Sequence, residues 1–296
     1  MTKLISLIMT LVSFFCGLFC GVPDNDLSLK RIEGIPYGID EQQKVDVYIP
    51  KKVRSDAVMV FIHSGAWVGG YRNEFSDKMK YYADNLGVSA ASVGYRFVGE
   101  NSSVTYEDML CDISDALNAI KNIGAANGIR FKNAAFCGLS AGGHLALLYA
   151  YKCSEISPIA IAYAVGYAAP ADFTDMGYYS VSSDGVLSAG LPIEKLCGAD
   201  FSKGLKDTDN INKLRNASPI TYASAGIPTV IIHGKADNVV PYSNAVNLFN
   251  ELQSRGIESY LFAYDEVGHL LTQAAENDAL LNKTLEEFAV KYLNME

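Results

Sequence analysis

Short apolar runs alternate with longer stretches of helical periodicity along most of the chain, and this alternation limits the possible folds more than any other feature. Runs such as AVMVFIH (57–63), NAAFCG (133–138) and PTVIIHG (228–234) are almost wholly apolar, as expected of strands covered on both faces. Between such runs, residues 106–124 place apolar side chains on one helical face, namely those of Met109, Ile113, Leu117 and Ile120. The pattern predicts a mainly parallel sheet with helices on both faces.

The same reading predicts the remaining elements. Further strands are expected at 44–50, 88–97, 159–168 and 259–264, and further helices at 74–87, 141–151, 244–256 and 277–293. With 296 residues, 49% of them hydrophobic and 19% charged, the chain can bury a full core, as one large α/β domain or two small ones. The net charge of −9 argues against binding of nucleic acid or of an anionic membrane surface by charge.

The first residues have the layout of an export signal. One lysine precedes an almost unbroken apolar run, and the sequence turns polar at Pro23-Asp24-Asn25. We therefore expect a signal peptide at 1–22, a mature domain at 23–296 with no membrane span, and a secreted or periplasmic protein. Two alternatives stay open: a single membrane-spanning helix, and a lipid anchor at Cys20, although the bulky Phe19 fits a lipoprotein cleavage site poorly.

Cysteine and histidine usage bears on disulfides and metals. The mature domain would retain Cys111, Cys137, Cys153 and Cys197, which are too sparse for a disulfide scaffold. Cys111 and Cys137 are expected to be buried free thiols. There is no Cys-x-x-Cys pair and no histidine cluster, so the sequence predicts no zinc site and no cofactor.

One segment interrupts the alternation of strands and helices. Residues 172–223 are rich in Gly, Ser, Tyr and Asp and show few periodic signals. Long insertions in compact domains are more often lids or binding loops than neutral excursions, so we expect a small cap over the active site here.

The sequence GLSAGG (138–143) joins a predicted strand to a predicted helix. A sharp strand-to-helix turn holds its apex residue in a strained backbone conformation, and a Cβ on either flank of that residue would collide with the turn. Gly138 and Gly142 provide small neighbours, and they leave Ser140 at the apex as a candidate nucleophile. Serine is a poor nucleophile at neutral pH unless a base takes its proton and a third group orients that base.

The partners of this serine must come from four histidines and a few loop carboxylates. His63 ends a strand, His144 lies one turn beyond Ser140, and His233 lies in an apolar strand, where a histidine is more often a satisfied core residue. His269 follows a predicted strand on a glycine-bearing loop, which makes it the candidate base.

Asp237 follows strand 228–234 on a different loop and could approach the imidazole of His269 from behind, whereas Asp265 and Glu266 lie within the loop of His269 itself. We favour Asp237. The chain order Ser140, Asp237, His269 is the order expected of an α/β-hydrolase.

A turn after an early strand completes the candidate site. Acyl transfer develops negative charge on the carbonyl oxygen, and backbone N–H groups must point at it. HSGAW (63–67) is a glycine-containing turn at a strand end that exposes such groups, and Ala141, the residue after the nucleophile, supplies another.

These motifs together resemble a known family. HSGAW, VGYRF, GLSAGGH, HGKADNVVP and a later GH are similar to motifs of the hormone-sensitive-lipase-like carboxylesterases and of the bacterial feruloyl and acetyl xylan esterases, over nearly the whole mature chain. The resemblance implies the α/β-hydrolase fold, no cofactor, and the catalytic residues Ser140, His269 and Asp237. It also implies oxyanion donors at Gly65, Ala66 and Ala141, with His63 and Trp67 as structural neighbours of the site.

The chain departs from the usual His-Gly-Gly-Gly-Trp of that family. Ser64 and Ala66 replace the first and third glycines, and their side chains narrow the pocket. The implied activity is hydrolysis of carboxylic esters through an acyl-enzyme, on a small-molecule or polysaccharide-linked substrate carrying short acyl or aryl groups such as acetyl or feruloyl. An arylformamidase or peptidase-type amidase on the same triad, and a non-catalytic binding protein on the same fold, stay open as alternatives. The oligomeric state is not predicted.

Overall fold

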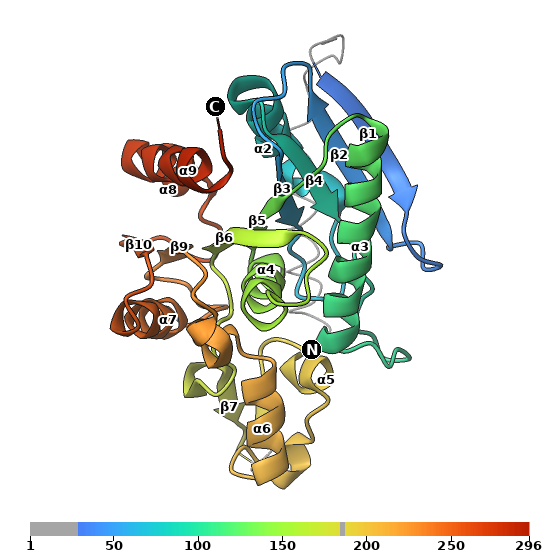
Figure 1. The fold of residues 1–296 in the computed structure, drawn as a ribbon. Coiled ribbons are helices and arrows are strands. Elements are labelled where there is room, and N and C mark those ends of the chain that lie inside the picture. The colour runs from blue at the N-terminus through green and yellow to red at the C-terminus, as the bar shows by residue number, and fades with distance from the viewer. Residues whose placement is uncertain (1–28, 184–186, 296) are drawn as a thin grey trace.

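The computed structural model of the protein describes residues 29–183 and 187–295 (Figure 1). Within them the main sheet has the strand order β1-β2-β4-β3-β5-β6-β9-β10. From β4 onward each neighbouring pair in this order is parallel, whereas β1 with β2 and β2 with β4 are antiparallel. The strands are β1 (Leu29–Pro36), β2 (Lys44–Pro50), β3 (Ala57–Ile62), β4 (Ser89–Val93), β5 (Asn133–Leu139), β6 (Ala160–Tyr167), β9 (Thr229–Gly234) and β10 (Ser259–Tyr264).

Helices cover both faces of this sheet, which confirms the predicted fold class (Figure 1). One face packs against α2 (Ser76–Tyr81), its continuation η2 (Tyr82–Leu86), and the C-terminal α8 (Thr272–Glu276) and α9 (Ala279–Tyr292). The other face packs against α3 (Tyr106–Ala126), α4 (Ala141–Lys152) and α7 (Ser243–Ser254). The central strand β3 is buried along its whole length because it has helices on both sides.

The predicted helices and strands appear close to their expected positions. The four apolar residues expected on one face of α3 are all 0% exposed. A capping box between Thr105 and Asp108 starts this helix, since each residue's side chain accepts from the other's backbone N–H. Gly87, expected as a helix stop, ends η2 with a left-handed φ of 68°.

Two features differ from the sequence expectations. β1, with the sequence LKRIEGIP, was not predicted, because its charged residues hide the alternation of an edge strand. Cys111 is exposed rather than buried, because it lies on the solvent side of α3, whereas Cys137 is buried as expected. The four described cysteines are all free thiols.

The segment expected as a cap forms a lobe of short elements at the carboxyl end of the sheet (Figure 1, yellow to orange). It contains η3 (Met176–Tyr178), the hairpin of β7 (Tyr179–Val181) and β8 (Leu187–Ala189), α5 (Ile193–Cys197), η4 (Phe201–Lys203), α6 (Thr208–Asn216) and η5 (Pro219–Ala225). Its apolar side chains, including those of Phe173, Ile193 and Leu214, join the core cluster of α3 and α4. The lobe's action as a cap stays a prediction.

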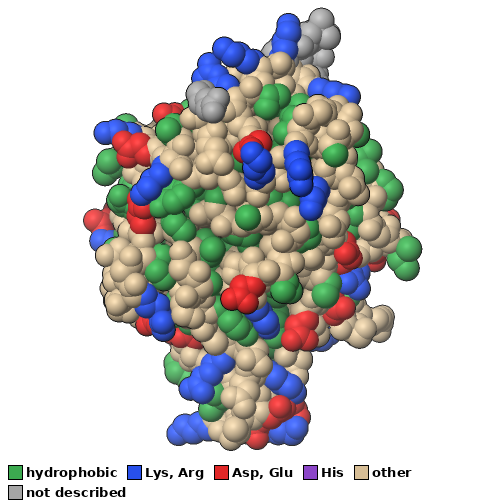
Figure 2. Space-filling model, in the orientation of Figure 1, with side chains coloured by type: hydrophobic (Ala, Val, Ile, Leu, Met, Phe, Trp, Pro, Cys, Tyr) green, Lys and Arg blue, Asp and Glu red, His purple; other side chains and the backbone are tan. Residues whose placement is uncertain are grey.

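The surface mixes charges of both signs. Figure 2 shows one face on which Lys and Arg lie interspersed with Asp and Glu, on the lobe as well as on the body of the molecule. In residues 29–183 and 187–295 we find no helix both long and apolar enough to cross a bilayer. The expected signal peptide at 1–22 lies outside the described residues.

Candidate active site

The turn between β5 and α4 holds Ser140 at its apex. Ser140 has φ 54° and ψ −119°, a conformation that is strained for a residue with a side chain. A Cβ on Gly142 would lie 2.0 Å from the carbonyl oxygen of Ile62, and one on Gly138 would lie 2.3 Å from the backbone of Gly142. Both flanking glycines are therefore required by close backbone approach, as the sequence predicts.

Ser140, His269 and Asp237 form one hydrogen-bonded chain. The hydroxyl of Ser140 is 2.9 Å from Nε2 of His269, and Nδ1 of His269 is 2.7 Å from Oδ2 of Asp237. The three residues come from the end of β5, the loop after β10 and the loop after β9, all at the carboxyl edge of the sheet. The alternative carboxylate, Asp265, is 82% exposed at its side chain and pairs with Lys235.

The side chain of Asp237 is fully buried and accepts several hydrogen bonds. Its Oδ1 accepts from the N–H groups of Val239 and Val240, and its Oδ2 accepts from His269. Burial alone would raise the pKa of Asp237, but the hydrogen bonds from His233 and His269 hold it well below its usual range. Asp237 therefore stays ionised and can stabilise an imidazolium at His269.

His233 contributes to this site in a way that sequence reasoning missed. It was expected as a satisfied core residue, and it is 0% exposed. Its Nε2 lies 3.1 Å from the carbonyl oxygen of Val240 and 3.3 Å from Oδ2 of Asp237. His233 thus gives Asp237 a second imidazole partner. In the sequence, the one sign of this contact is that His233 and Asp237 stand four residues apart in HGKAD.

The turn after β3 lies beside the nucleophile, because Ile62 pairs with Gly138 in the register of β3 and β5. Gly65, Ala66 and Trp67 have φ of 117°, 53° and 60°, which puts two residues with side chains in the left-handed region. Among the described residues, the N–H groups of Gly65, Ala66 and Ala141 donate to no protein acceptor. Unpaired N–H groups at such a position are available to an oxyanion.

His63 and Tyr95 pack together at the start of this turn. The imidazole of His63 stacks on the ring of Tyr95 with centroids 4.3 Å apart, and its Nδ1 lies 2.8 Å from the carbonyl oxygen of Ser64. The hydroxyl of Tyr95 donates to the carbonyl oxygen of His63. Burial lowers the pKa of His63 to about 4, so it is neutral at physiological pH.

Trp67 and His144 link the turn to the helix of the nucleophile and to the lobe. The indole N–H of Trp67 donates to Nδ1 of His144 at 3.2 Å, and Nε2 of His144 lies 2.8 Å from the carbonyl oxygen of Ala217 in the lobe. Phe173 packs against both rings. Burial lowers the pKa of His144 to about 4, and the residue has no free ring nitrogen to act as a base.

Glu74 is a second residue that the sequence did not single out. It lies in η1 (Arg72–Phe75), ten residues beyond Ser64. Its Oε2 accepts from the N–H of Ser64 at 2.6 Å, and its Oε1 accepts from the Ser64 hydroxyl at 2.7 Å. A carboxylate therefore binds the chain directly before the candidate oxyanion donors.

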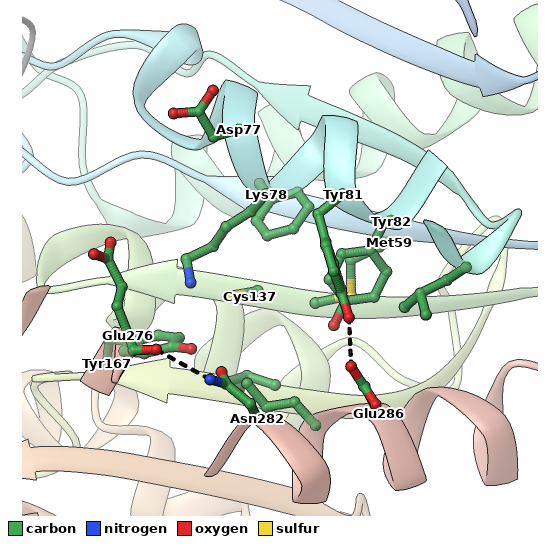
Figure 3. Close-up of a pocket in the computed structure, with 14 residues that line it drawn as sticks. Met59, Asp77, Lys78, Tyr81, Tyr82, Cys137, Tyr167, Glu276, Asn282 and Glu286 are labelled. Atoms are coloured by element: carbon green, nitrogen blue, oxygen red, sulfur yellow. Dashed lines mark hydrogen bonds between the residues drawn. The ribbon is translucent and has the colours of Figure 1, made fainter. Parts of the chain in front are cut away.

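A cavity of about 370 Å³ lies between α2 and α9, on the face of the sheet that α3, α4 and α7 do not cover (Figure 3). Met59, Cys137 and Tyr167 line its floor, and the hydrogen bond from Tyr81 to Glu286 crosses one side. Burial raises the pKa of Cys137 to about 12, so its thiol is not a nucleophile at neutral pH. None of the three triad residues lines this cavity.

No cluster of three or more metal-ligating side chains occurs in the part of the chain that the structure describes. The groups assembled around Ser140 are instead a nucleophile, a base, an orienting carboxylate and free N–H groups, which together can carry out acyl transfer.

Comparison with known proteins adds a family and several relatives. The sequence model of the BD-FAE family matches residues 45–252. A probable isoprenylcysteine alpha-carbonyl methylesterase from Oryza sativa subsp. japonica is 25% identical over 259 residues, covering 82% of this chain and 58% of that protein. A probable carboxylic ester hydrolase, LipM, from Mycobacterium tuberculosis is 25% identical over 215 residues, covering 70% of this chain and 47% of that protein. The chain thus spans about half to three fifths of these curated relatives.

Solved structures show the same fold. Esterase B from Lactobacillus rhamnosis superposes with a TM-score of 0.73 at 19% identity, covering 98% of this chain and 93% of its own. The truncated form of a carbohydrate esterase from gut microbiota superposes with a TM-score of 0.69 at 19% identity, covering 92% of this chain and 99% of its own. At these identities the likeness is one of fold, and the fold is the α/β-hydrolase fold.

Proposed function

The chain belongs to the BD-FAE family, and from this membership and the geometry at Ser140 we propose that it is a serine carboxylic ester hydrolase acting through an acyl-enzyme. The observation that carries the proposal is the continuous hydrogen-bonded chain from Ser140 through His269 to Asp237. Its geometry suits a nucleophile, a general base and an orienting acid without rearrangement.

The reaction follows from these contacts. As the Ser140 oxygen attacks the ester carbonyl, its proton passes to Nε2 of His269, and the oxyanion binds N–H groups of the turn and of Ala141. His269 then protonates the departing alcohol, which leaves an acyl group on Ser140. In the second half, His269 takes a proton from water, the hydroxide attacks the acyl group, and His269 returns the proton to Ser140 as the acid leaves.

For the substrate we propose short-chain or aryl esters, such as acetyl or feruloyl groups on plant polysaccharide. Ala66 in the oxyanion turn supports the proposal of a small acyl group, because its methyl group takes up space that a glycine would leave. A carbohydrate esterase among the structural neighbours is consistent with a sugar-linked ester. An exported enzyme, as the N-terminal sequence predicts, would meet such polymers outside the cell.

A hydrolysis panel tests this proposal. The mature domain is assayed on p-nitrophenyl acetate, butyrate and decanoate, methyl ferulate and acetylated xylan, beside Ser140→Ala and the control Ser254→Ala, an exposed serine at the end of α7. We expect turnover of the short and aryl esters, a loss of ~10³-fold or more in Ser140→Ala, and no loss in the control.

Two outcomes would count against it. If the wild-type domain cleaves no ester faster than Ser140→Ala, the esterase proposal fails, and N-formyl aryl amines and peptide amides become the next substrates to assay. If decanoate is preferred over acetate and ferulate, the enzyme is a hydrolase of long acyl chains and the proposed substrate class is wrong.

A further inference from the structure

The oxyanion turn carries strain that its own sequence does not remove. Ala66 and Trp67 both adopt left-handed φ angles, at 53° and 60°, where a Cβ crowds the backbone. Residues persist in such conformations only where surrounding contacts hold them there. The hydrogen bond from the N–H of Val68 to the carbonyl oxygen of Gly65, at 3.0 Å, closes the turn, but it does not fix the turn relative to Ser140.

The contact between Ser64 and Glu74 supplies an anchor outside the turn. The Glu74 carboxyl group engages both the backbone N–H and the hydroxyl of Ser64, at 2.6 Å and 2.7 Å, so Ser64 can neither rotate nor shift without breaking one of them. On the opposite side of the same residue, Nδ1 of His63 contacts the Ser64 carbonyl oxygen. The residue that precedes the oxyanion donors is thus held at its N–H, its side chain and its carbonyl.

The arrangement depends on a side chain that a glycine could not provide. Ser64 stands where the resembled esterases usually have glycine, and its hydroxyl makes one of the two contacts to Glu74. Desolvation of the Glu74 carboxyl group raises its pKa to about 7, although the Ser64 hydrogen bonds lower it. Either protonation state can make both contacts, because a neutral carboxyl group can donate to the Ser64 hydroxyl while it accepts the N–H.

We propose that Glu74 is a positioning residue for ester hydrolysis: through Ser64 it sets the N–H groups of Gly65 and Ala66 at the distance from Ser140 that the oxyanion requires. The inference rests on the proposed esterase function and deepens it. Glu74 acts through Ser64 and does not itself touch the substrate. Its effect therefore falls on the transition state, where charge is on the oxyanion, and not on the bound ester.

The test compares four variants with wild type. Glu74→Ala removes both contacts, Ser64→Ala removes only the hydroxyl contact, and Glu74→Gln keeps an acceptor for the N–H and a donor for the hydroxyl. Glu286→Ala is the matched control. Glu286 is also a glutamate that accepts a hydrogen bond from a hydroxyl group, that of Tyr81, but it does not contact the turn. Each variant is characterised by its kcat and KM on p-nitrophenyl acetate and its thermal midpoint.

A second measurement does not depend on ester turnover. Diethyl p-nitrophenyl phosphate phosphorylates an activated serine, and its phosphoryl oxygen takes the oxyanion's place, so the rate of p-nitrophenol release reports the turn directly. If the wild type is phosphorylated but cleaves no ester, the proposed function fails, and the phosphorylation rates of the variants still test the positioning role. Wild type that does both, with variants unchanged, defeats the positioning role alone.

We expect Glu74→Ala to lower kcat and the phosphorylation rate by ~10- to 100-fold with KM nearly unchanged, less than the loss of a whole oxyanion donor. Ser64→Ala should show a smaller loss in the same direction, and Glu74→Gln and Glu286→Ala should stay within about threefold of wild type. If Glu74→Ala does not fold, the kcat values of Ser64→Ala and Glu74→Gln decide whether the positioning role holds. Three results would overturn the proposal. Ser64→Ala and Glu74→Ala could both keep the wild-type kcat, or Glu74→Ala could change KM but not kcat. In the third, kcat of Glu74→Gln is as low as that of Glu74→Ala.

Discussion

Two buried acidic side chains of the candidate site, Asp237 of the triad and Glu74, have pKa values shifted in opposite directions. Asp237 accepts hydrogen bonds from two backbone N–H groups and two imidazoles, and these hold its pKa well below the usual range even though its side chain is fully buried. Among the described residues, Glu74 accepts hydrogen bonds from Ser64 alone, and desolvation raises its pKa to about 7. The number of donors around each carboxylate therefore accounts for the opposite directions of the two pKa shifts.

The raised pKa of Glu74 makes stability depend on pH. The folded protein binds this proton more tightly than the unfolded chain, so the Glu74 contribution to the free energy of unfolding is complete below the ordinary pKa of 4.5 and is lost as the pH rises to about 7. Relative to Glu74→Gln, wild type should lose on the order of 3 kcal/mol between about pH 4.5 and about pH 8, because each pKa unit of this shift corresponds to about 1.4 kcal/mol.

Denaturant unfolding of both proteins across this range measures the difference. Only the difference between wild type and Glu74→Gln is informative, because all other titrating groups are common to both. Parallel stability curves for the two proteins would mean that the Glu74 carboxyl group has an ordinary pKa.

The sequence was sufficient to nominate the residues of the triad, and the structure brings them together. Ser140 and His269 stand in local patterns, a strand-to-helix turn and a glycine-bearing loop at a strand end, and local patterns are visible in a sequence. The roles of His233 and Glu74 were missed because each depends on which side chain meets it after folding. Glu74 lies in a predicted helix, where a glutamate is normally solvated, and only the tertiary fold turns it toward Ser64.

At the level of the elements, the junction between β5 and α4 is constrained by close backbone contacts. Gly142, in the first turn of α4, faces the carbonyl oxygens of Ile62 and His63, so β3 and α4 meet backbone to backbone. The same contact places the turn after β3 beside Ser140. The position of the oxyanion donors is thus a direct result of how closely these two elements pack.

Gly142→Ala should therefore damage the fold as well as the site. The added Cβ would lie 2.0 Å from the carbonyl oxygen of Ile62, and we expect a loss of about 3 kcal/mol in the free energy of unfolding, at the upper end for overpacking, together with loss of activity. Gly128→Ala is the control: a Cβ there meets nothing within 4 Å, and because the φ of Gly128 is positive, at 77°, only the backbone strain of about 1–2 kcal/mol is expected. Equal unfolding free energies for the two variants would contradict this view of the junction.

The elements themselves were largely predictable, and the exceptions have physical reasons. Continuous apolar runs such as β3 and β9 identify strands buried on both faces, because few other elements tolerate them. β1 was missed since an edge strand needs little apolar character. The lobe gave no clear signal because its helices and strands are short, and they owe their stability to packing on α3 and α4 more than to local propensity.

For the whole molecule, the sheet's carboxyl edge gathers the triad, the oxyanion turn and the lobe. Ser140, Asp237 and His269 lie after three different strands, and a single sheet brings them together. The lobe contacts this assembly through Phe173 and through the carbonyl oxygen of Ala217, which bonds His144. The geometry of the candidate site therefore depends on the entire domain, and no isolated segment should retain it.

The expected signal peptide gives a prediction at the same scale. Expressed at full length in a bacterial host, the protein should reach the periplasm or the medium, shortened by about 22 residues in mass spectrometry. A Phe14→Arg variant, with a charge in the apolar run, should stay in the cytoplasm at full length. Recovery of full-length wild type in the membrane fraction would favour the membrane-spanning alternative.

Trp67, the last residue of the oxyanion turn, is the single tryptophan of the sequence, and its fully buried indole donates a hydrogen bond to His144. All tryptophan fluorescence of the protein therefore originates at one point, in contact with the turn, the nucleophile's helix and the lobe. The unlabelled protein carries its own optical probe, and stopped-flow emission would report any change around the indole when an ester is mixed with the protein.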